Sequence, residues 1–392
     1  MLIEITALAL GIIIGTLTGL FPGIHINLVI VFLSTLLSYN LGIPILSLII
    51  FIVSLSVTHT FLDFIPGIFL GCPDEDTALS VLPGHQMLKE GKGYEAIIHT
   101  LKGCLTGLLI SIILTPVFIF LLPKFYELIK QSMFLILAIT SLFLIISDEN
   151  KFLAFIIFMF SGFLGIASMN LPIQQPLLPL LTGLFGCSTL ITSISKKVEI
   201  PKQEISKPFS RKNFKTILAS VFVSPLCSFL PGIGSNQAAI ISYEILRKIE
   251  KQDFLFLIGS INTIIMSLSF VTLYAINKAR TGSAVFIGQL TPLSPKILLI
   301  ILSTILASGI LASFSTLFFA KIFAKHITKF SYAKISIIVL LFIFALVLII
   351  SKPLGILVLF SSTLLGLTAI QFNVRRTQLM GCLILPAIFF VF

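Results

Sequence analysis

The stretch GLFPGIHINL, residues 19 to 28, places a Pro-Gly pair inside an apolar run long enough to cross a bilayer. The stretch FLPGIGSNQA, residues 229 to 238, places the same Pro-Gly-Ile core inside a second apolar run. Proline removes a backbone donor and clashes with the preceding turn, so each pair frees backbone groups that hydrocarbon cannot satisfy. The two stretches therefore predict two broken helices, because such backbone is tolerated at membrane depth only inside protein or along a wet cavity.

The composition is that of an integral membrane protein. The chain has 392 residues, of which 57% are hydrophobic and 10% are charged, and its mean hydropathy is +1.13. Soluble domains carry about 25% charged residues. The apolar runs are continuous rather than alternating, which favours helices over a lipid-facing barrel. We predict an all-α polytopic protein of the cell membrane with roughly ten to twelve transmembrane helices.

Charge and cysteine usage argue against two other classes of partner. The net charge of +11 comes from basic residues spread over the loops, as the positive-inside rule predicts, so no nucleic acid is expected as a partner. The five cysteines are scattered without C-x-x-C spacing, which predicts packing residues rather than disulfides or a zinc site. The N-terminus lacks a basic n-region and is interpreted as a retained first helix.

A basic stretch divides the chain into two related halves. Lysine and arginine outnumber glutamate over residues 193–215, which predicts the cytoplasmic side for this segment. Each half carries one Pro-Gly-Ile break about 20 residues from its start. We predict a first membrane repeat over 1–192, a basic cytoplasmic linker over 193–213 and a second membrane repeat over 214–392. Transporters with such repeats favour an inverted arrangement.

The residues at the two breaks suit an anion. A helix that restarts after a break points its N-terminal NH groups and its positive dipole end into the cavity. Neutral amides and hydroxyls follow both breaks, and a purely structural proline kink is the alternative. The predicted substrate-binding residues are Pro22, Gly23, His25, Asn27, Pro231, Gly232, Gly234, Ser235, Asn236 and Gln237. Arg280 joins them because arginine holds a carboxylate or phosphate through two parallel hydrogen bonds, although an ordinary surface arginine is equally consistent with its loop.

Acidic residues of the first half are candidates for binding a coupling ion. Asp63 lies in HTFLDFIPG, residues 59 to 67, and His59 one turn earlier is its predicted partner. A structural His-Asp pair is the alternative. Asp74 and Asp76 either cap a helix or bind Na⁺ or H⁺. Asn262 is a further candidate, because Asn262-Thr263 follows the second break at a spacing similar to that of His59-Thr60 after the first. Apart from Na⁺ as a coupling ion, no cofactor or metal site is expected.

Three motifs resemble signature regions of the TctA family, the large membrane permease subunit of tripartite tricarboxylate transporters. They are GLFPGIHINL, DTALSVLPGHQMLKEGKGYEAI at residues 76 to 97 and FLPGIGSNQAAIISYEILRK at residues 229 to 248. The chain resembles this family as a shorter and divergent member. The resemblance implies a permease of two related halves that moves carboxylates with an ion gradient. It also implies a solute-binding protein and a small membrane subunit as partners. The fold transfers better than the ligand.

The leading hypothesis is a symporter of a small organic anion, di- or tricarboxylate-like, coupled to Na⁺ or H⁺. The alternative is a translocase for a polyprenyl phosphate, since a phosphate head group would also suit paired helix starts. A membrane enzyme is the weakest hypothesis, because H-E-x-x-H and G-x-S-x-G signatures are absent from the sequence. Metal-dependent hydrolysis would have to rest on Asp74, Glu75, Asp76 and His85. A homodimer is retained as an option for assembly.

Overall fold

The computed structural model is built from helices. The residues that it describes are 2–21, 26, 29–30, 33, 43–71, 75–129, 132–146, 148–195, 200–205, 214–228, 235–246, 249–327 and 332–390. Every regular element within these residues is helical, which confirms the predicted all-α class.

The chain order of the helices follows the two parts of the sequence. Before the basic stretch they are α1 (Leu2–Leu20), α3 (Ile45–Leu62), α4 (Phe64–Leu70), η1 (Glu75–Ser80), α5 (Val81–Lys89), α6 (Gly93–Ile113), α7 (Thr115–Ile129), α8 (Met133–Ile146), α9 (Lys151–Asn170), α10 (Leu177–Leu181), η3 (Thr182–Cys187) and α11 (Ser188–Ser195). After it they are α12 (Phe214–Cys227), α13 (Ser235–Leu246), α14 (Lys251–Ile276), α15 (Gly282–Leu290), α16 (Pro295–His326), α17 (Tyr332–Gln371), η5 (Arg376–Met380) and α18 (Gly381–Phe390).

The protein is a multi-pass membrane protein. Within the described residues, the helices long and apolar enough to cross a bilayer are Leu2–Leu20, Ile45–Leu70, Gly93–Ile113, Lys151–Asn170, Lys251–Ile276, Pro295–His326 and Ser336–Gln371. The shorter apolar helices are Leu137–Ile146, Leu177–Thr192, Phe214–Pro225 and Arg376–Phe389. The expected count of ten to twelve crossings stays a prediction. The described residues contain seven helices long enough to cross and several shorter apolar helices whose crossing is not settled by length.

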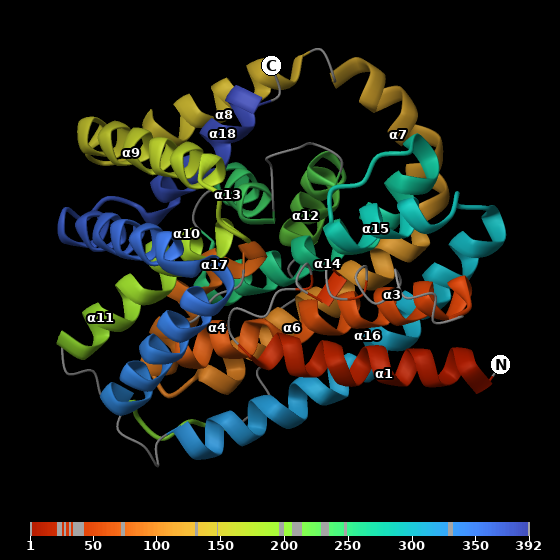
Figure 1. Ribbon diagram of the computed structural model, residues 1–392, viewed down its shortest axis with the longest axis horizontal. Helices are drawn as coiled ribbons and strands as arrows, with labels where there is room; N and C mark the ends of the chain where they lie inside the picture. The colour runs from red at the N-terminus through yellow and green to blue at the C-terminus, as the bar shows by residue number, and fades with distance from the viewer. Residues whose placement is uncertain are drawn as a thin grey trace.

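Helices α3 and α14 form the centre of the molecule. An 18-residue window of α14 is 94% buried, and one of α3 with α4 is 83% buried, far more than the 22% of α1. Helices α1, α6, α12 and α16 pack around this pair (Figure 1). The centre is therefore screened from lipid, which allows it to carry polar side chains.

Glycines let the central helices approach closely. An added Cβ on Gly103 of α6 would lie 2.1 Å from the Phe256 carbonyl oxygen of α14, and one on Gly259 of α14 would lie 2.2 Å from the Thr100 carbonyl oxygen of α6. One on Gly107 would lie 2.5 Å from the Ser260 carbonyl oxygen. Small residues at a helix interface are the usual means of close packing in membranes.

The directions of the central helices follow from their contacts. Helices α6 and α14 are parallel, since Glu95 accepts a hydrogen bond from Gln252 near both starts and Gly107 meets Ile264 further along. The segment α3–α4 runs the other way, because Phe69 near its end lies beside Gly93 at the start of α6. Helices α3 and α14 are therefore antiparallel.

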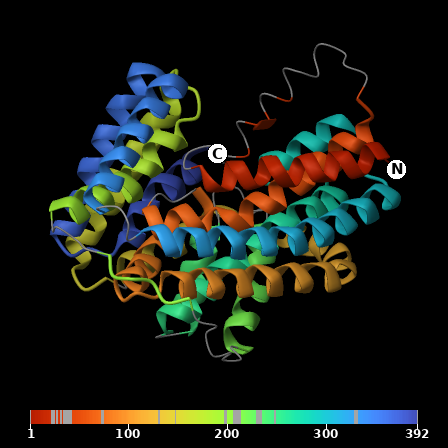
Figure 2. The ribbon, with the colours of Figure 1, turned by 90° about the horizontal axis from the view of Figure 1, so that it is seen from below.

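The later helices gather with α9 and η3 at one end of the molecule. Helix α18 packs on α9, and α17 packs on η3 and α11. Figure 2 shows these blue and yellow-green helices grouped apart from α1 and α16. Helix α17 is interrupted at Lys352, which has a φ of 59° and directly precedes Pro353.

Candidate functional site

Asp63 lies at a break between two helices in the buried centre. Helix α3 ends at Leu62 and α4 begins at Phe64, with Asp63 between them. Pro66 has no N–H, so it cannot donate to the Leu62 carbonyl as a continuing helix would require. The Asp63 side chain is only 3% exposed. The local sequence thus places a carboxylate at a helix junction inside the molecule.

A chain of polar side chains leads from Asp63 into the second half of the sequence. The Asn262 amide nitrogen donates to Asp63 Oδ2 at 3.5 Å. The Ser235 hydroxyl donates to Asn262 Oδ1 at 3.2 Å. All three side chains are buried, and they come from the α3–α4 junction, the middle of α14 and the first residue of α13. The structure brings together three predicted residues that lie far apart in the sequence.

The start of α13 is also connected to the acidic segment of the first half. The Leu79 backbone N–H, in η1, donates to Asn236 Oδ1 at 3.2 Å. Asn236 is 2% exposed and follows Ser235 at the beginning of α13. The elements η1 and α13, which carry parts of the predicted motifs of the two halves, are therefore in contact.

His59 lies on the α1 side of α3. Its ring Nδ1 is 3.0 Å from Thr18 Oγ1 of α1, and its carbonyl accepts the Asp63 backbone N–H. Gly19 lets helix α1 approach this closely because it has no Cβ; an added Cβ would lie 3.0 Å from the His59 carbonyl oxygen. The predicted pairing of His59 with Asp63 stays a prediction, and the Thr18 contact was not expected from the sequence.

Arg280 follows α14 in the loop that leads to α15. The residue is partly buried, whereas Lys278 is exposed. Its guanidinium is close enough to Cys227, at the end of α12, to act on that side chain electrostatically. Arg280 is thus near the end of the helix that precedes the second Pro-Gly pair.

Several predicted site residues lie outside the described part of the chain. They are Pro22, Gly23, His25, Asn27, Asp74, Pro231, Gly232 and Gly234, together with the side chains of Gln237 and Asp76. Their roles stay predictions. The cysteines among the described residues, Cys104, Cys187, Cys227 and Cys382, are all buried, as expected for packing residues.

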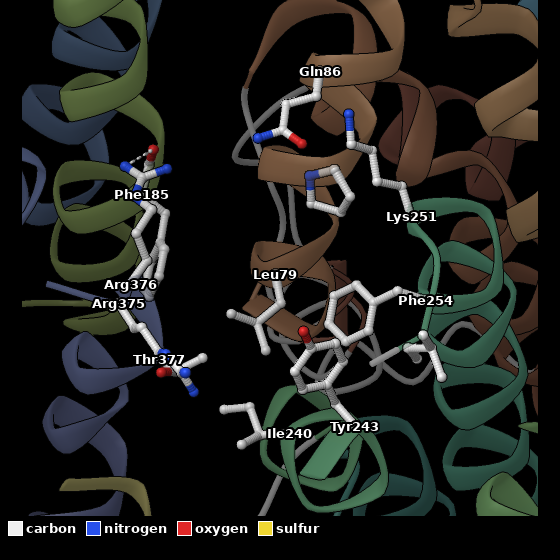
Figure 3. A pocket seen from close by; sticks show the side chains of 12 residues that line it. Leu79, Gln86, Phe185, Ile240, Tyr243, Lys251, Phe254, Arg375, Arg376 and Thr377 are labelled. Carbon is white, nitrogen blue, oxygen red and sulfur yellow. Dashed lines mark hydrogen bonds between the residues drawn. The ribbon is translucent and has the colours of Figure 1, made fainter. Parts of the chain in front are cut away.

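A pocket of about 380 Å³ lies beside this network. One wall carries Phe185, Arg375, Arg376 and Thr377, and the opposite wall carries Leu79, Gln86, Ile240, Tyr243, Lys251 and Phe254 (Figure 3). Pro83 and Ile249 complete the lining. The sequence analysis missed this pocket, although the Arg-Arg pair between the last two apolar segments was a visible signal.

Arg376 is fixed against a π-helix. Its guanidinium donates to Thr189 Oγ1 at 2.7 Å, to Ser188 Oγ at 2.6 Å and to the Phe185 carbonyl at 3.1 Å. Phe185 belongs to η3, a π-helix, and such wide turns are frequent at functional sites. The guanidinium therefore has a defined position on the pocket wall.

Asp148 holds the backbone that carries the two arginines. Its Oδ2 accepts the Arg375 backbone N–H and the Gln378 amide, each at 3.2 Å. Gln378 also donates to the Leu144 carbonyl at 2.8 Å. Asp148 and Gln378 are almost completely buried, so η5 is anchored to the end of α8.

Comparison with known proteins gives a match over nearly the whole chain. The profile of the family described as "Tripartite tricarboxylate transporter TctA family" matches residues 5–381. The uncharacterized protein MJ1079 of Methanocaldococcus jannaschii is 32% identical over 402 residues, and the alignment covers 99% of each chain. No solved structure gives a significant match.

Proposed function

The chain belongs to the tripartite tricarboxylate transporter TctA family, and from this premise we propose that it is a secondary transporter of a small organic anion, coupled to Na⁺ or H⁺. The family is one of transporters and not of enzymes. It comprises the large membrane subunits of tripartite systems, so we propose a small membrane subunit and a solute-binding protein as partners. The proposed location is the cell membrane.

The observation that carries the proposal is the buried series of Asp63, Asn262 and Ser235. An ionisable side chain in the middle of a membrane protein is costly and is by default a functional residue. Na⁺ takes oxygen ligands, and a carboxylate, an amide and a hydroxyl supply them, whereas H⁺ would bind the carboxylate itself. We propose Asp63 as the coupling residue, with Asn262 and Ser235 completing its surroundings.

The proposed substrate position is next to this series, at the start of α13. This helix begins at Ser235, directly after residues 231–234 of the second Pro-Gly motif. The N-terminal NH groups and the positive end of a helix dipole favour an anion. Arg280, near the end of α12, would add a full positive charge from the other side of the motif.

The helix directions support the proposal of two inverted halves. Helix α14 packs on α6 in parallel, and α3 packs on α16 in parallel, since Phe61 meets Thr316 and Phe69 meets Phe323. Helix α1 packs on α3, and α12 packs on α14, so the two halves contribute corresponding contacts. Helix α3 of the first half and α14 of the second half occupy corresponding places but run in opposite directions. This is the relation expected between inverted repeats, which secondary transporters use for alternating access.

The experiment is ion-driven uptake into proteoliposomes by the purified protein and two variants. Asp63→Asn keeps the shape of the side chain and removes its charge, so uptake of a labelled di- or tricarboxylate is expected to lose its dependence on the Na⁺ or H⁺ gradient. Asp253→Asn, a carboxylate in the first turn of α14 and outside the Asp63 series, is the control and should retain that dependence. Gradient-driven uptake by Asp63→Asn at the wild-type rate would refute the proposal.

A further inference from the structure

We propose that the pocket beside η5 binds an amphipathic organic anion, a carboxylate or phosphate head attached to an apolar body. This inference rests on the proposed function, because it names the substrate class of that transporter. It differs from a compact tricarboxylate, which has no apolar body to bury.

The positive charge of the pocket has a defined source. Within the described part of the chain, the hydrogen bonds of the Arg376 guanidinium all go to neutral acceptors and it makes no ion pair. Its charge is therefore left for a ligand anion. Arg375 lies beside it on the same wall (Figure 3). Arginine is the residue best suited to a carboxylate or phosphate, since its fork matches two oxygens.

The opposite wall is mainly apolar. Leu79, Ile240 and Phe254 face the arginine wall, and the Tyr243 ring packs edge-on against Phe254 with ring centroids 5.4 Å apart (Figure 3). Tyr243 adds one hydroxyl to this surface. Pockets of roughly 300 to 1,000 Å³ with apolar walls and a few polar groups are typical of small-molecule sites. One charged wall and one apolar wall together select an anion with an apolar body.

A third cation of the pocket lining is already paired. Lys251 Nζ lies 2.8 Å from Glu90 Oε1, and both side chains are about half exposed. The pair lies on the face where residues 200–205 of the basic stretch pack, since the Glu204 N–H donates to the Gly91 carbonyl. If this stretch is cytoplasmic, as the sequence predicts, the pocket lies on the cytoplasmic side of the protein.

One residue connects the pocket with the buried network. The Leu79 side chain lines the pocket, while its backbone N–H donates to Asn236 Oδ1. Asn236 is next to Ser235, which contacts Asn262 and through it Asp63. A ligand that moves Leu79 would therefore act on the start of α13, so occupancy of the pocket and of the ion site would be coupled.

The test is isothermal titration calorimetry of the full-length protein in detergent with four probes: 4-phenylbutyrate, geranyl phosphate, citrate and inorganic phosphate. At least one amphipathic probe is expected to bind ten or more times tighter than citrate and inorganic phosphate. Arg375→Gln and Arg376→Gln should each weaken it about ten- to hundredfold, the effect of losing one charged hydrogen bond. Ile249→Phe, which fills the pocket, should weaken it similarly.

Two controls make the result decisive. Lys124→Gln removes an exposed charge on α7, which contributes no pocket residue, and should leave binding unchanged. If Arg376→Gln does not fold, Arg375→Gln and Ile249→Phe carry the test. Binding of citrate as tight as that of both amphipathic probes, binding that survives the pocket variants, or no binding of any probe to folded protein would overturn the proposal.

The outcomes also separate this inference from the proposed function. Binding of 4-phenylbutyrate with gradient-driven uptake supports both. Binding of geranyl phosphate alone supports the pocket but refutes transport of a soluble anion, and favours a lipid-phosphate translocase. Uptake of citrate that depends on Asp63, without competition by either amphipathic probe, supports the transporter and refutes the pocket.

Discussion

The contact between α6 and α14 allows a sharp prediction about the variant Gly259→Ala. The added Cβ would lie 2.2 Å from the Thr100 carbonyl oxygen and 3.0 Å from the Thr100 carbonyl carbon. An ordinary contact between carbon and oxygen is about 3.3 Å, so the two helices must separate by about 1 Å. The obstacle is backbone, which cannot rotate away as a side chain can.

The expected cost follows from two opposing terms. Overpacking of this kind destabilises by about 1–3 kcal/mol, and the upper end applies because the neighbour is a helix backbone. Alanine gains about 1 kcal/mol over glycine through helix propensity. The free energy of unfolding should therefore fall by about 2 kcal/mol. Asn262 is one turn after Gly259, so the same shift would break its 3.5 Å contact with Asp63 and reduce uptake further.

The assay is unfolding in mixed micelles with increasing SDS, followed by far-UV circular dichroism, with uptake measured in parallel. The matched control is Gly288→Ala in α15, where the added Cβ would meet the terminal methyl of Leu273 at 2.9 Å and that side chain can give way. The control should be as stable as the wild type or slightly more so. If Gly259→Ala unfolds at the same SDS fraction as Gly288→Ala, the reasoning about backbone contact is wrong.

Three further predictions concern separate parts of the molecule. Burial, aided by the charge of Lys89, lowers the pKa of His85 from 6.5 to about 4, so the unfolded chain binds this proton at a higher pH than the folded chain does. The free energy of unfolding should therefore fall by at most about 3 kcal/mol as the pH drops from 6.5 to 4. In unfolding measured against pH, His85→Gln should flatten that slope. Lys352→Gly should stabilise by about 1 kcal/mol in the same unfolding assay, because φ is 59° there; equal or lower stability would refute strain at this bend. Asp148→Ala should destabilise by about 2–3 kcal/mol and weaken ligand binding, since it leaves the Gln378 amide with one acceptor fewer; unchanged binding would show that Asp148 does not position the arginines.

The His85 ring also bears on the hypothesis of a membrane enzyme. Its Nδ1–H donates to the Ile68 carbonyl at 3.1 Å, and the residue is 3% exposed. A ring held in this way serves as a packing and hydrogen-bonding group between α4 and α5.

Several features could be predicted from the sequence because they depend on neighbouring residues. Hydropathy is a property of each segment by itself, so the all-α membrane class follows directly from the sequence. The break in α17 follows from Pro353, and the helix junction at Asp63 follows from Pro66. An acid between phenylalanine and leucine was also sufficient to single out Asp63 as a candidate site residue.

The tertiary structure alone decided which segments meet. Leu79 touches Asn236, and Asn262 touches Asp63, across separations of more than a hundred residues. The pocket likewise joins Tyr243 to Arg376, which no periodicity or motif spacing relates. Local pattern determines which face of a helix is small or polar, but the neighbour of that face depends on how all the helices pack. That packing is fixed by backbone contacts such as those at Gly103 and Gly259, which exist only in the folded chain.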